Sequence, residues 1–138
     1  MGNNISIKTA NYEDMQEAIK DVHSLIINTL NKENQSCLIT RTASMQTEVS
    51  ILNEYLLKNR DIRIVVYGTN ANDNSIRQKC EQLLGLGFNN IFLYAGGLFE
   101  WLLLQDIYGD ELFPTTKKEL DILKYKAPSM FGLRLIEN

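Results

Sequence analysis

The residues best placed to do chemistry gather in one short stretch, "GTNANDNS", which runs from Gly68 to Ser75. It follows the apolar, strand-forming residues "VVY" and precedes a candidate helix. Loops at the carboxyl ends of strands are where ligands bind in open α/β folds. This loop offers only hydroxyls, amides and one carboxylate. Its residues are Gly68, Thr69, Asn70, Ala71, Asn72, Asp73, Asn74 and Ser75.

Nucleotide binding is disfavoured by the same stretch. From Gly68 the loop has the length of the phosphate-binding pattern G-x-x-x-x-G-K-[ST]. Asp73 stands where that pattern has its second glycine, and Asn74 stands where it has its lysine. The loop therefore lacks the cation that would hold terminal phosphates, and the Asp73 carboxylate would repel them.

Metal binding and covalent catalysis have few candidate residues. His23 is the only histidine and is far in sequence from Cys37 and Cys80, whereas a structural zinc site needs four ligands at close spacing. Serine–histidine or cysteine–histidine catalysis requires that the fold bring His23 to the loop. Cys80 lies on an apolar helical stripe and Cys37 opens an apolar run, so we expect both thiols to be buried. We expect no metal, no cofactor and a surface position for His23.

The whole chain has the composition of an ordinary globular protein. Its 138 residues are 44% hydrophobic and 22% charged, with a net charge of −3, which fits one domain and gives no basic face for nucleic acid. Two cysteines are too few for a disulfide framework. No secretory signal or transmembrane span is evident, so we expect a cytoplasmic location.

The N-terminal residues "MGNNIS" fit the N-myristoylation pattern, with Gly2 as the acceptor and Ser6 at the required position. A chance match is the alternative, since the pattern is short. One acyl chain anchors weakly, and no polybasic cluster follows to strengthen it. We therefore expect at most weak membrane contact.

Apolar patterning predicts alternating strands and helices. Asn11 is a candidate N-cap for the helix that starts at Tyr12. The expected strands are Ile5–Lys8, Leu25–Asn28, Cys37–Thr40, Ile62–Tyr67 and residues 90–94, and the expected helices are residues 12–20, 44–57, 75–84 and about 98–109. The near-continuous apolar run in Ile62–Tyr67 is typical of a central strand. This order favours an α/β protein with a parallel sheet flanked by helices on both faces.

The chain after residue 112 differs in character. We expect a domain over residues 1–112 and a C-terminal extension, residues 113–138, packed on that domain or on a partner. A capping box from Thr116 to Glu119 predicts a helix over Lys117–Leu123, and Pro128 ends regular structure. The helix at about 98–109 is apolar almost all round and needs further cover. The expected cover is Phe113, Leu120, Leu123, Met130, Phe131, Leu133 and Leu135.

A family resemblance rests on a glycine-stopped helix, a strand, a glycine pair and a tryptophan. The residues that carry it are Leu86, Gly87, Phe88, Asn90, Ile91, Gly96, Gly97 and Trp101. In this the sequence resembles the rhodanese (sulfurtransferase) superfamily. The resemblance implies a rhodanese-like sheet with Trp101 facing it, and an active loop after the "VVY" strand.

Active members of that superfamily begin this loop with a cysteine that carries a persulfide or attacks phosphate or arsenate. Backbone N–H groups around it form an anion cradle. Gly68 stands at the matching position, and the loop lacks the arginine of the C-x-x-G-x-R pattern. Its greater length is nearer the phosphatase-like pattern C-x-x-x-x-x-R, whose arginine position falls on Asn74. The family signature D-V-R is also replaced, with Asn28 and Leu30 at its charged positions.

These departures predict a non-catalytic rhodanese-like module that binds a protein partner or joins a larger assembly. In this interpretation Thr69, Asn72 and Asn74 satisfy the loop backbone and cap the following helix. Two alternatives stay open. One is a phosphatase-like or sulfurtransferase-like enzyme with an atypical or partner-supplied nucleophile. The other is a sensor that binds a small anion without turning it over.

Overall fold

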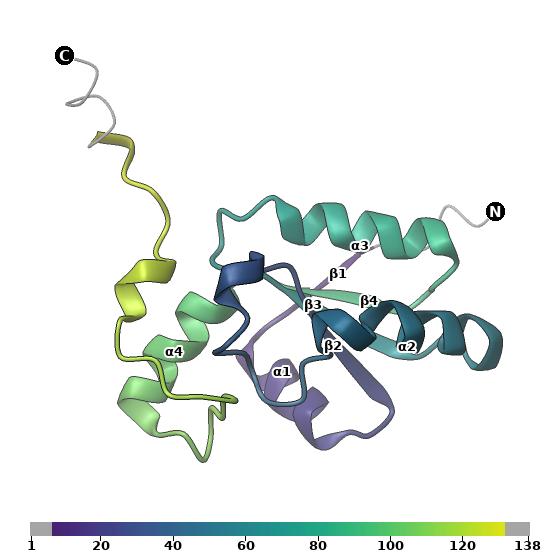
Figure 1. Ribbon diagram of the computed structural model, residues 1–138, viewed down its shortest axis with the longest axis horizontal. Coiled ribbons are helices and arrows are strands. Elements are labelled where there is room, and N and C mark those ends of the chain that lie inside the picture. The colour runs from purple at the N-terminus through teal and green to yellow at the C-terminus, as the bar shows by residue number, and fades with distance from the viewer. Residues whose placement is uncertain (1–6, 132–138) are drawn as a thin grey trace.

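The computed structural model describes residues 7–131, and a four-stranded parallel sheet lies at its centre (Figure 1). The strands are β1 (Lys8–Ala10), β2 (Ser24–Asn28), β3 (Arg63–Tyr67) and β4 (Ile91–Tyr94). Their order is β1-β4-β3-β2, so β3 is central, as its apolar run predicts. No helix among the described residues is long and apolar enough to cross a membrane.

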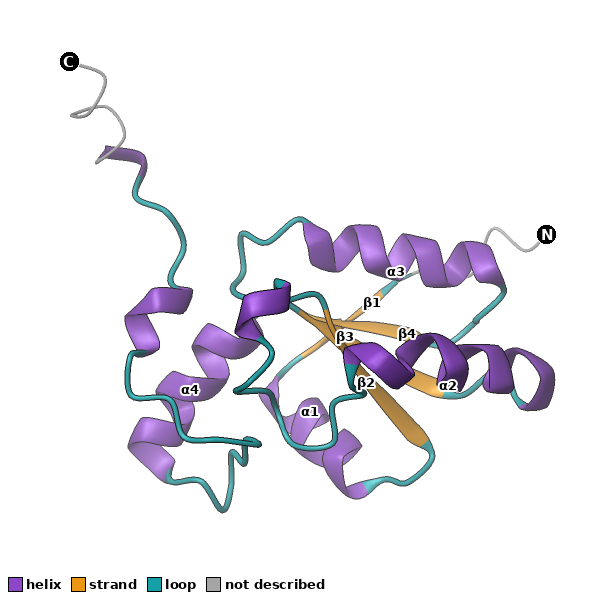
Figure 2. Cartoon of the chain, in the orientation of Figure 1, coloured by secondary structure: helices purple, strands orange, loops and turns teal. Residues whose placement is uncertain are grey.

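Helices cover both faces of the sheet (Figure 2). On one face α1 (Tyr12–Lys20) and α4 (Gly97–Tyr108) bury Met15, Trp101 and their neighbours. On the other face α2 (Met45–Lys58) and α3 (Ser75–Leu86) bury Leu52, Cys80 and their neighbours. The α/β fold expected from the sequence is therefore confirmed.

The central strand feeds both layers of the core because its side chains alternate between the two faces. Val65 and Tyr67 join the cluster under α1 and α4. Ile64 and Val66 join the cluster under α2 and α3. Tyr67 lies opposite Tyr94 of β4 in the parallel register. The loops that follow β3 and β4 therefore leave the sheet side by side, at the carboxyl ends of these strands.

The expected strand at Cys37–Thr40 is wrong. In this run only Ile39 forms a bridge, an isolated antiparallel pairing with Thr115. The Ile39 N–H donates to the Tyr67 hydroxyl at 3.1 Å, and the Leu38 N–H donates to the Thr116 hydroxyl at 3.0 Å. The apolar side chains are buried as expected, but the backbone pairs only briefly with residues 114–116: the Thr116 N–H donates to the Leu38 carbonyl at 2.8 Å, and the Thr40 N–H donates to the Pro114 carbonyl at 3.2 Å.

The expected helix at Lys117–Leu123 is also wrong. The Thr116 hydroxyl, which the capping box would use, donates instead to the Ser36 carbonyl at 3.1 Å. The only helical turn here is η3, a 3₁₀ turn at Ile122–Tyr125.

Two other boundaries shift. The N-terminal strand lies at Lys8–Ala10 rather than Ile5–Lys8, and residues 5 and 6 lie outside the described residues. Helix α3 continues through Gly85 and ends at Gly87, whose φ of 117° suits glycine.

Helix α2 lies within one residue of its expected span. The Asn11 cap of α1 is confirmed as a full capping box with Asp14.

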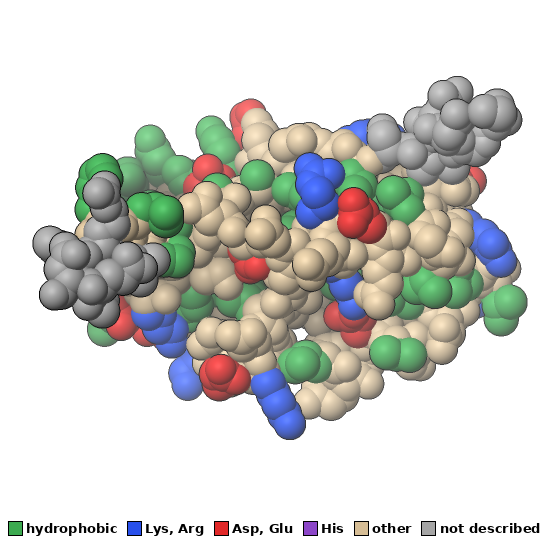
Figure 3. Space-filling model, turned by 90° about the horizontal axis from the view of Figure 1, so that it is seen from above, with side chains coloured by type: hydrophobic (Ala, Val, Ile, Leu, Met, Phe, Trp, Pro, Cys, Tyr) green, Lys and Arg blue, Asp and Glu red, His purple; other side chains and the backbone are tan. Residues whose placement is uncertain are grey.

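The extension leaves several large apolar side chains in solvent. Leu120, Leu123, Met130 and Phe131 are exposed, so four of the side chains expected to cover α4 do not. Leu133 and Leu135 lie outside the described residues. Leu103, Ile107, Tyr108 and Leu112 are exposed as well. Figure 3 shows hydrophobic side chains exposed at the molecular surface.

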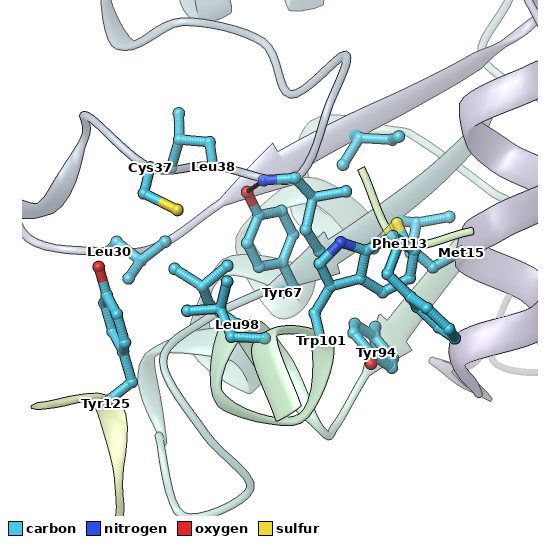
Figure 4. Close-up of a cluster of buried hydrophobic side chains, with 14 of the residues drawn as sticks. Met15, Leu30, Cys37, Leu38, Tyr67, Tyr94, Leu98, Trp101, Phe113 and Tyr125 are labelled. Carbon is cyan, nitrogen blue, oxygen red and sulfur yellow. Dashed lines mark hydrogen bonds between the residues drawn. The ribbon is translucent and has the colours of Figure 1, made fainter. Parts of the chain in front are cut away.

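Two aromatic residues anchor the extension to the domain (Figure 4). Phe113 is buried edge-on against Trp101, with ring centroids 5.0 Å apart. Tyr125 is buried in the same cluster. The Trp101 indole N–H donates to the Pro114 carbonyl at 3.1 Å, and the Gln105 amide donates to the Phe113 carbonyl at 2.7 Å. The core under α4 therefore includes residues from the extension.

Candidate functional site

The β3–α3 loop, residues 68–74, is held against the first turn of α4. The N–H of Leu98 donates to the Gly68 carbonyl, and the N–H of Phe99 donates to the Thr69 carbonyl, each at 2.9 Å. This close approach explains the glycine at the start of α4. Gly97 has a φ of +66°, and a Cβ there would lie 2.7 Å from the Gly68 carbonyl oxygen.

The Asp73 carboxylate folds back into its own loop. Its Oδ2 accepts from the Thr69 N–H at 2.9 Å. Its Oδ1 accepts from the Ser75 N–H at 3.0 Å and from the Ser75 hydroxyl at 2.5 Å. The side chain thus binds two backbone donors that flank the loop, as a bound anion would.

The pKa of Asp73 reflects this arrangement. Burial raises the pKa of the carboxyl, but hydrogen bonds from the Ser75 hydroxyl and from the Thr69 and Ser75 backbone outweigh burial. The net effect holds the pKa below its ordinary value, so the carboxylate is charged at neutral pH.

The space around Gly68 is filled. A Cβ at this residue would lie 2.5 Å from the Asp73 Oδ2, and 2.7 Å from both the Ile76 Cγ1 and the Thr29 hydroxyl oxygen. Real Cβ atoms do not make contacts this short. A larger side chain at residue 68 therefore requires that the loop rearrange.

The asparagines of the loop take different roles. Asn70 is buried, accepts from the Asn72 N–H at 2.9 Å and donates to the Tyr125 carbonyl at 2.8 Å. Asn72 and Asn74 are exposed, and the Asn74 side chain makes no capping hydrogen bond to α3. The expected capping role of the Asn74 side chain is therefore wrong. The Asp73 carboxylate accepts from the first N–H of α3, that of Ser75.

A shallow depression of about 310 Å³ lies over the loop. Thr69, Asn72 and Ser75 line it, together with Pro128 from the extension. Asp73 is the only charged side chain among the described residues of its lining. The depression therefore offers hydroxyl and amide groups and one negative charge.

The cysteines and the histidine lie away from this depression. Both thiols are buried, as expected, and burial raises the pKa of Cys80 to about 11. His23 is exposed just before β2. It therefore lies at the amino-terminal ends of the parallel strands, whereas the β3–α3 loop lies at their carboxyl ends. No group of three or more potential metal ligands occurs within residues 7–131.

The residues at the expected second signature are structural. Asn28 is buried, and its side-chain Oδ1 accepts from the Leu30 N–H at 3.0 Å and from the Gln35 side-chain amide at 2.8 Å. Leu30 packs in the core under α4. Amide and apolar groups thus shape the turn after β2.

Comparison with known families agrees with this geometry. The model of the rhodanese-like domain matches residues 17–104, which include β2 to β4 and the β3–α3 loop. The chain belongs to the rhodanese-like family. Among curated protein sequences, none matches this rhodanese-like chain.

Solved structures share the fold of this rhodanese-like domain. Ygr203w of Saccharomyces cerevisiae, described as a homologue of single-domain rhodanese and of the Cdc25 phosphatase catalytic domain, superposes with a TM-score of 0.61 and 14% identity, covering 93% of this chain and 97% of that one. Alr3790 of Anabaena sp. superposes with a TM-score of 0.58 at 19% sequence identity. The match covers 82% of this chain and 83% of that chain. The As-Sb reductase of Leishmania major superposes with a TM-score of 0.56 at 14% sequence identity. The match covers 96% of this chain and 100% of that chain.

Sequence reasoning missed the role of Asp73. The sequence indicated a charge that would repel an anion, whereas the structure shows a side chain that bonds the loop's own donors. The signal was present in the spacing, because an aspartate shortly before a helix is a typical turn and cap former. Gly2, the possible acylation site, lies outside the described residues.

Proposed function

We propose that this rhodanese-like domain is a pseudoenzyme that acts as a protein-binding or assembly module. The single observation that carries the proposal is the state of the β3–α3 loop. Gly68 supplies no nucleophile, and the Asp73 carboxylate already bonds the backbone donors at Thr69 and Ser75. Catalysis by oxyanion stabilisation needs such donors aimed at the substrate.

The electrostatics of the loop support the same conclusion. An incoming phosphate, arsenate or thiosulfate would meet the negative charge of Asp73 before it met any donor. No lysine or arginine among the described lining residues offsets that charge. This weakens the case for an anion sensor, because the anion would have to displace a well-bonded carboxylate.

The crowding at Gly68 argues against a nucleophile supplied by a partner. An inserted sulfur or oxygen atom would need the space that a Cβ cannot enter beside Asp73 and Thr29. Productive attack requires atoms placed within a few ångströms of each other in a set geometry. The loop would have to open before any partner could complete a site there.

The exposed apolar surface supports a binding role. Leu103 and Ile107 of α4 are exposed, as are Leu112 and Leu123 of the following segment. Clusters of exposed large apolar side chains mark interaction surfaces in soluble proteins. This surface includes neither the loop depression nor its lining residues.

The experiment for catalytic silence uses the full chain, two assays and one substitution. We expect no thiosulfate:cyanide sulfur transfer and no aryl-phosphate hydrolysis above a blank. Gly68→Cys alone should restore neither, because no cation stabilises the transition state. Turnover by the unmodified protein would contradict the proposal.

Anion binding is tested separately by NMR titration with inorganic phosphate. The Thr69 and Ser75 amide signals should not shift in the native protein. They should shift in Asp73→Ala, because that change frees both donors. Phosphate-dependent shifts of these signals in the native protein would support the anion sensor instead.

The binding role is tested by affinity capture with two matched variants. Ile107→Glu should abolish capture of the partner, since it places a charge in the exposed apolar surface. Val22→Glu is the control, because Val22 is equally exposed but lies in the α1–β2 connection. If both variants capture the partner equally well, the partner binds to a surface other than the one that includes Ile107.

A further inference from the structure

Three hollows adjoin at the carboxyl ends of β2 and β3. The middle one is a groove of about 450 Å³ between α2 and α3. It shares Thr29 and Ser75 with the depression over the β3–α3 loop. It shares Gln35 and Met45 with a third hollow, of about 430 Å³, beside the start of α2. The three form one open furrow, and neither the family match nor the proposed binding surface on α4 assigns it a role.

The floor of the α2–α3 groove is fixed and has no net charge. Glu48 of α2 and Lys79 of α3 form an ion pair at 2.5 Å, and their side chains are only 12% and 24% exposed. At the end of β2 the Gln35 side-chain amide donates to the Asn28 Oδ1 at 2.8 Å. These groups already have partners, so the two walls of the groove decide what it binds.

The wall formed by α3 offers free amide groups at a regular spacing. Gln78 and Gln82 line the groove and are exposed. Neither side-chain amide makes a hydrogen bond within residues 7–131. Residues four apart on a helix lie about 6 Å apart along its axis. Each amide can donate from its nitrogen and accept at its oxygen, and can therefore pair with a peptide group.

The wall formed by α2 is apolar and has the same spacing. Met45 and Val49 lie four residues apart and are 47% and 65% exposed. They continue the helical stripe that includes the buried Leu52. The flexible side chain of a methionine adapts to the shape of a partner. A segment in the groove would therefore meet amides on one side and apolar groups on the other.

An extended polypeptide segment fits both walls. In a strand conformation the N–H and C=O of every second residue point to the same side, with a repeat of about 6.6 Å. Gln78 and Gln82 can therefore pair with the backbone of alternate residues, while small apolar side chains contact Met45 and Val49. A long open furrow suits such a segment better than a small molecule, because small-molecule sites enclose most of the ligand.

The two ends of the furrow carry opposite charges. Asp73 is the charged residue of the depression over the β3–α3 loop. Lys32 lines the hollow beside the start of α2 and forms no ion pair with any described residue. Complementary charges favour a basic residue of the bound segment at the Asp73 end and an acidic residue at the Lys32 end.

We propose that the furrow binds an extended segment of a partner protein, uncharged in its centre, with its backbone paired to Gln78 and Gln82. The inference rests on the proposed function, because it assigns one class of partner to a protein-binding module. It uses a surface separate from Leu103 and Ile107 of α4, so each surface can be tested without the other.

The experiment selects binders from a phage-displayed library of random dodecapeptides, with the full chain as bait. Selected peptides should bind at least about tenfold more weakly to the double variant Gln78→Ala with Gln82→Ala, which removes two pairs of hydrogen bonds. The matched control is Arg77→Ala with Glu81→Ala, because these exposed residues lie on the same helix outside the groove. Neither double variant changes the net charge, and both replace exposed residues, so both should fold.

Fluorescence anisotropy with a labelled synthetic copy of a selected peptide measures these affinities. N-methylation of its backbone should weaken binding at alternate positions, since the methyl group removes an N–H donor. Equal affinity for the two double variants, or no enriched peptide, would overturn the inference. Peptides that lose affinity for Ile107→Glu but not for the glutamine variant would also overturn it, while supporting the proposed surface on α4.

Discussion

Gly68 is constrained by its neighbours more than by its own backbone. It has no left-handed φ, but its surroundings leave no room for a Cβ because Asp73, Ile76 and Thr29 already contact that position. A nucleophile could therefore not be introduced here without also changing Asp73. The absence of a side chain at Gly68 and the inward turn of Asp73 therefore depend on each other sterically.

The substitution Gly68→Ala should lower the free energy of unfolding by about 1–3 kcal/mol, the usual cost of overpacking. Urea denaturation followed by tryptophan fluorescence measures it. Gly85→Ala is the matched control, because nothing lies within 4 Å of a Cβ there and the residue is inside α3. That control should gain roughly 0.5–1 kcal/mol. Equal free energies of unfolding for the two variants would show that the β3–α3 loop accommodates a Cβ at residue 68 without a measurable cost.

Asp73 also predicts a pH dependence. Its folded pKa is lowered, so its contribution to stability is fully present above the unfolded value of about 3.9 and is lost as the pH falls through the folded pKa. Asp73→Asn should be less stable than the native protein at neutral pH, and the difference should shrink in acid. Denaturation curves from pH 7 down to pH 2 measure this. A constant difference across that range would contradict the assigned hydrogen bonds.

At the scale of elements, a sequence pattern predicts a helix or strand correctly where the residues of that element alone determine it. The apolar run in β3, the cap at Asn11 and the stripe of α2 each predict an element that the structure contains. The run at residues 37–40 fails because its burial comes from contacts far away in sequence, at Tyr67 and Thr116. A propensity pattern cannot tell a strand from an apolar loop whose partners are distant.

The site was predictable in composition but not in geometry. The sequence located the β3–α3 loop and its lack of a nucleophile relative to the family pattern. It could not show that Asp73 bonds Thr69 and Ser75, because that depends on the path of the loop. It also could not show that Asn70 ties the loop to the Tyr125 carbonyl, since 55 residues separate them.

Tyr125 tests the anchoring of the extension. Tyr125→Ala should destabilise the protein by about 3–5 kcal/mol, because it empties a buried aromatic site in the core under α4. Leu123→Ala, in the same 3₁₀ turn but 62% exposed, should change stability by less than about 0.5 kcal/mol. Thermal and urea denaturation measure both. If the two variants lose similar stability, Tyr125 is not an anchor.

At the scale of the whole molecule, the division into residues 1–112 and 113–138 stays a prediction. The packing argues for dependence between the two parts. The Trp101 indole and the Gln105 amide donate to carbonyls of the extension, and Phe113 contacts the Trp101 ring. A domain cut at residue 112 would leave these donors without their acceptors.

Truncation after Leu112 should therefore leave no cooperatively folded domain at room temperature. Loss of two buried aromatic side chains costs about 1.5–3 kcal/mol each, and each unsatisfied buried donor adds about 1–3 kcal/mol. These losses approach the total stability of a typical domain, about 5–15 kcal/mol. Circular dichroism melting curves measure the outcome. Truncation after Phe131 should fold, and a cooperative transition in the shorter chain would show that residues 1–112 suffice.

The strand order has a consequence for how the protein is made. Lys8 of β1 pairs with Phe92 of β4, and β1 has no other strand beside it in the described sheet. Among the described strands, β1 is synthesised before β2, β3 and β4, yet it can pair only after β4 has been made. Such distant pairing slows folding and leaves apolar surface open in the meantime. We therefore expect β1 to join the sheet last, after β2, β3 and β4 have come together.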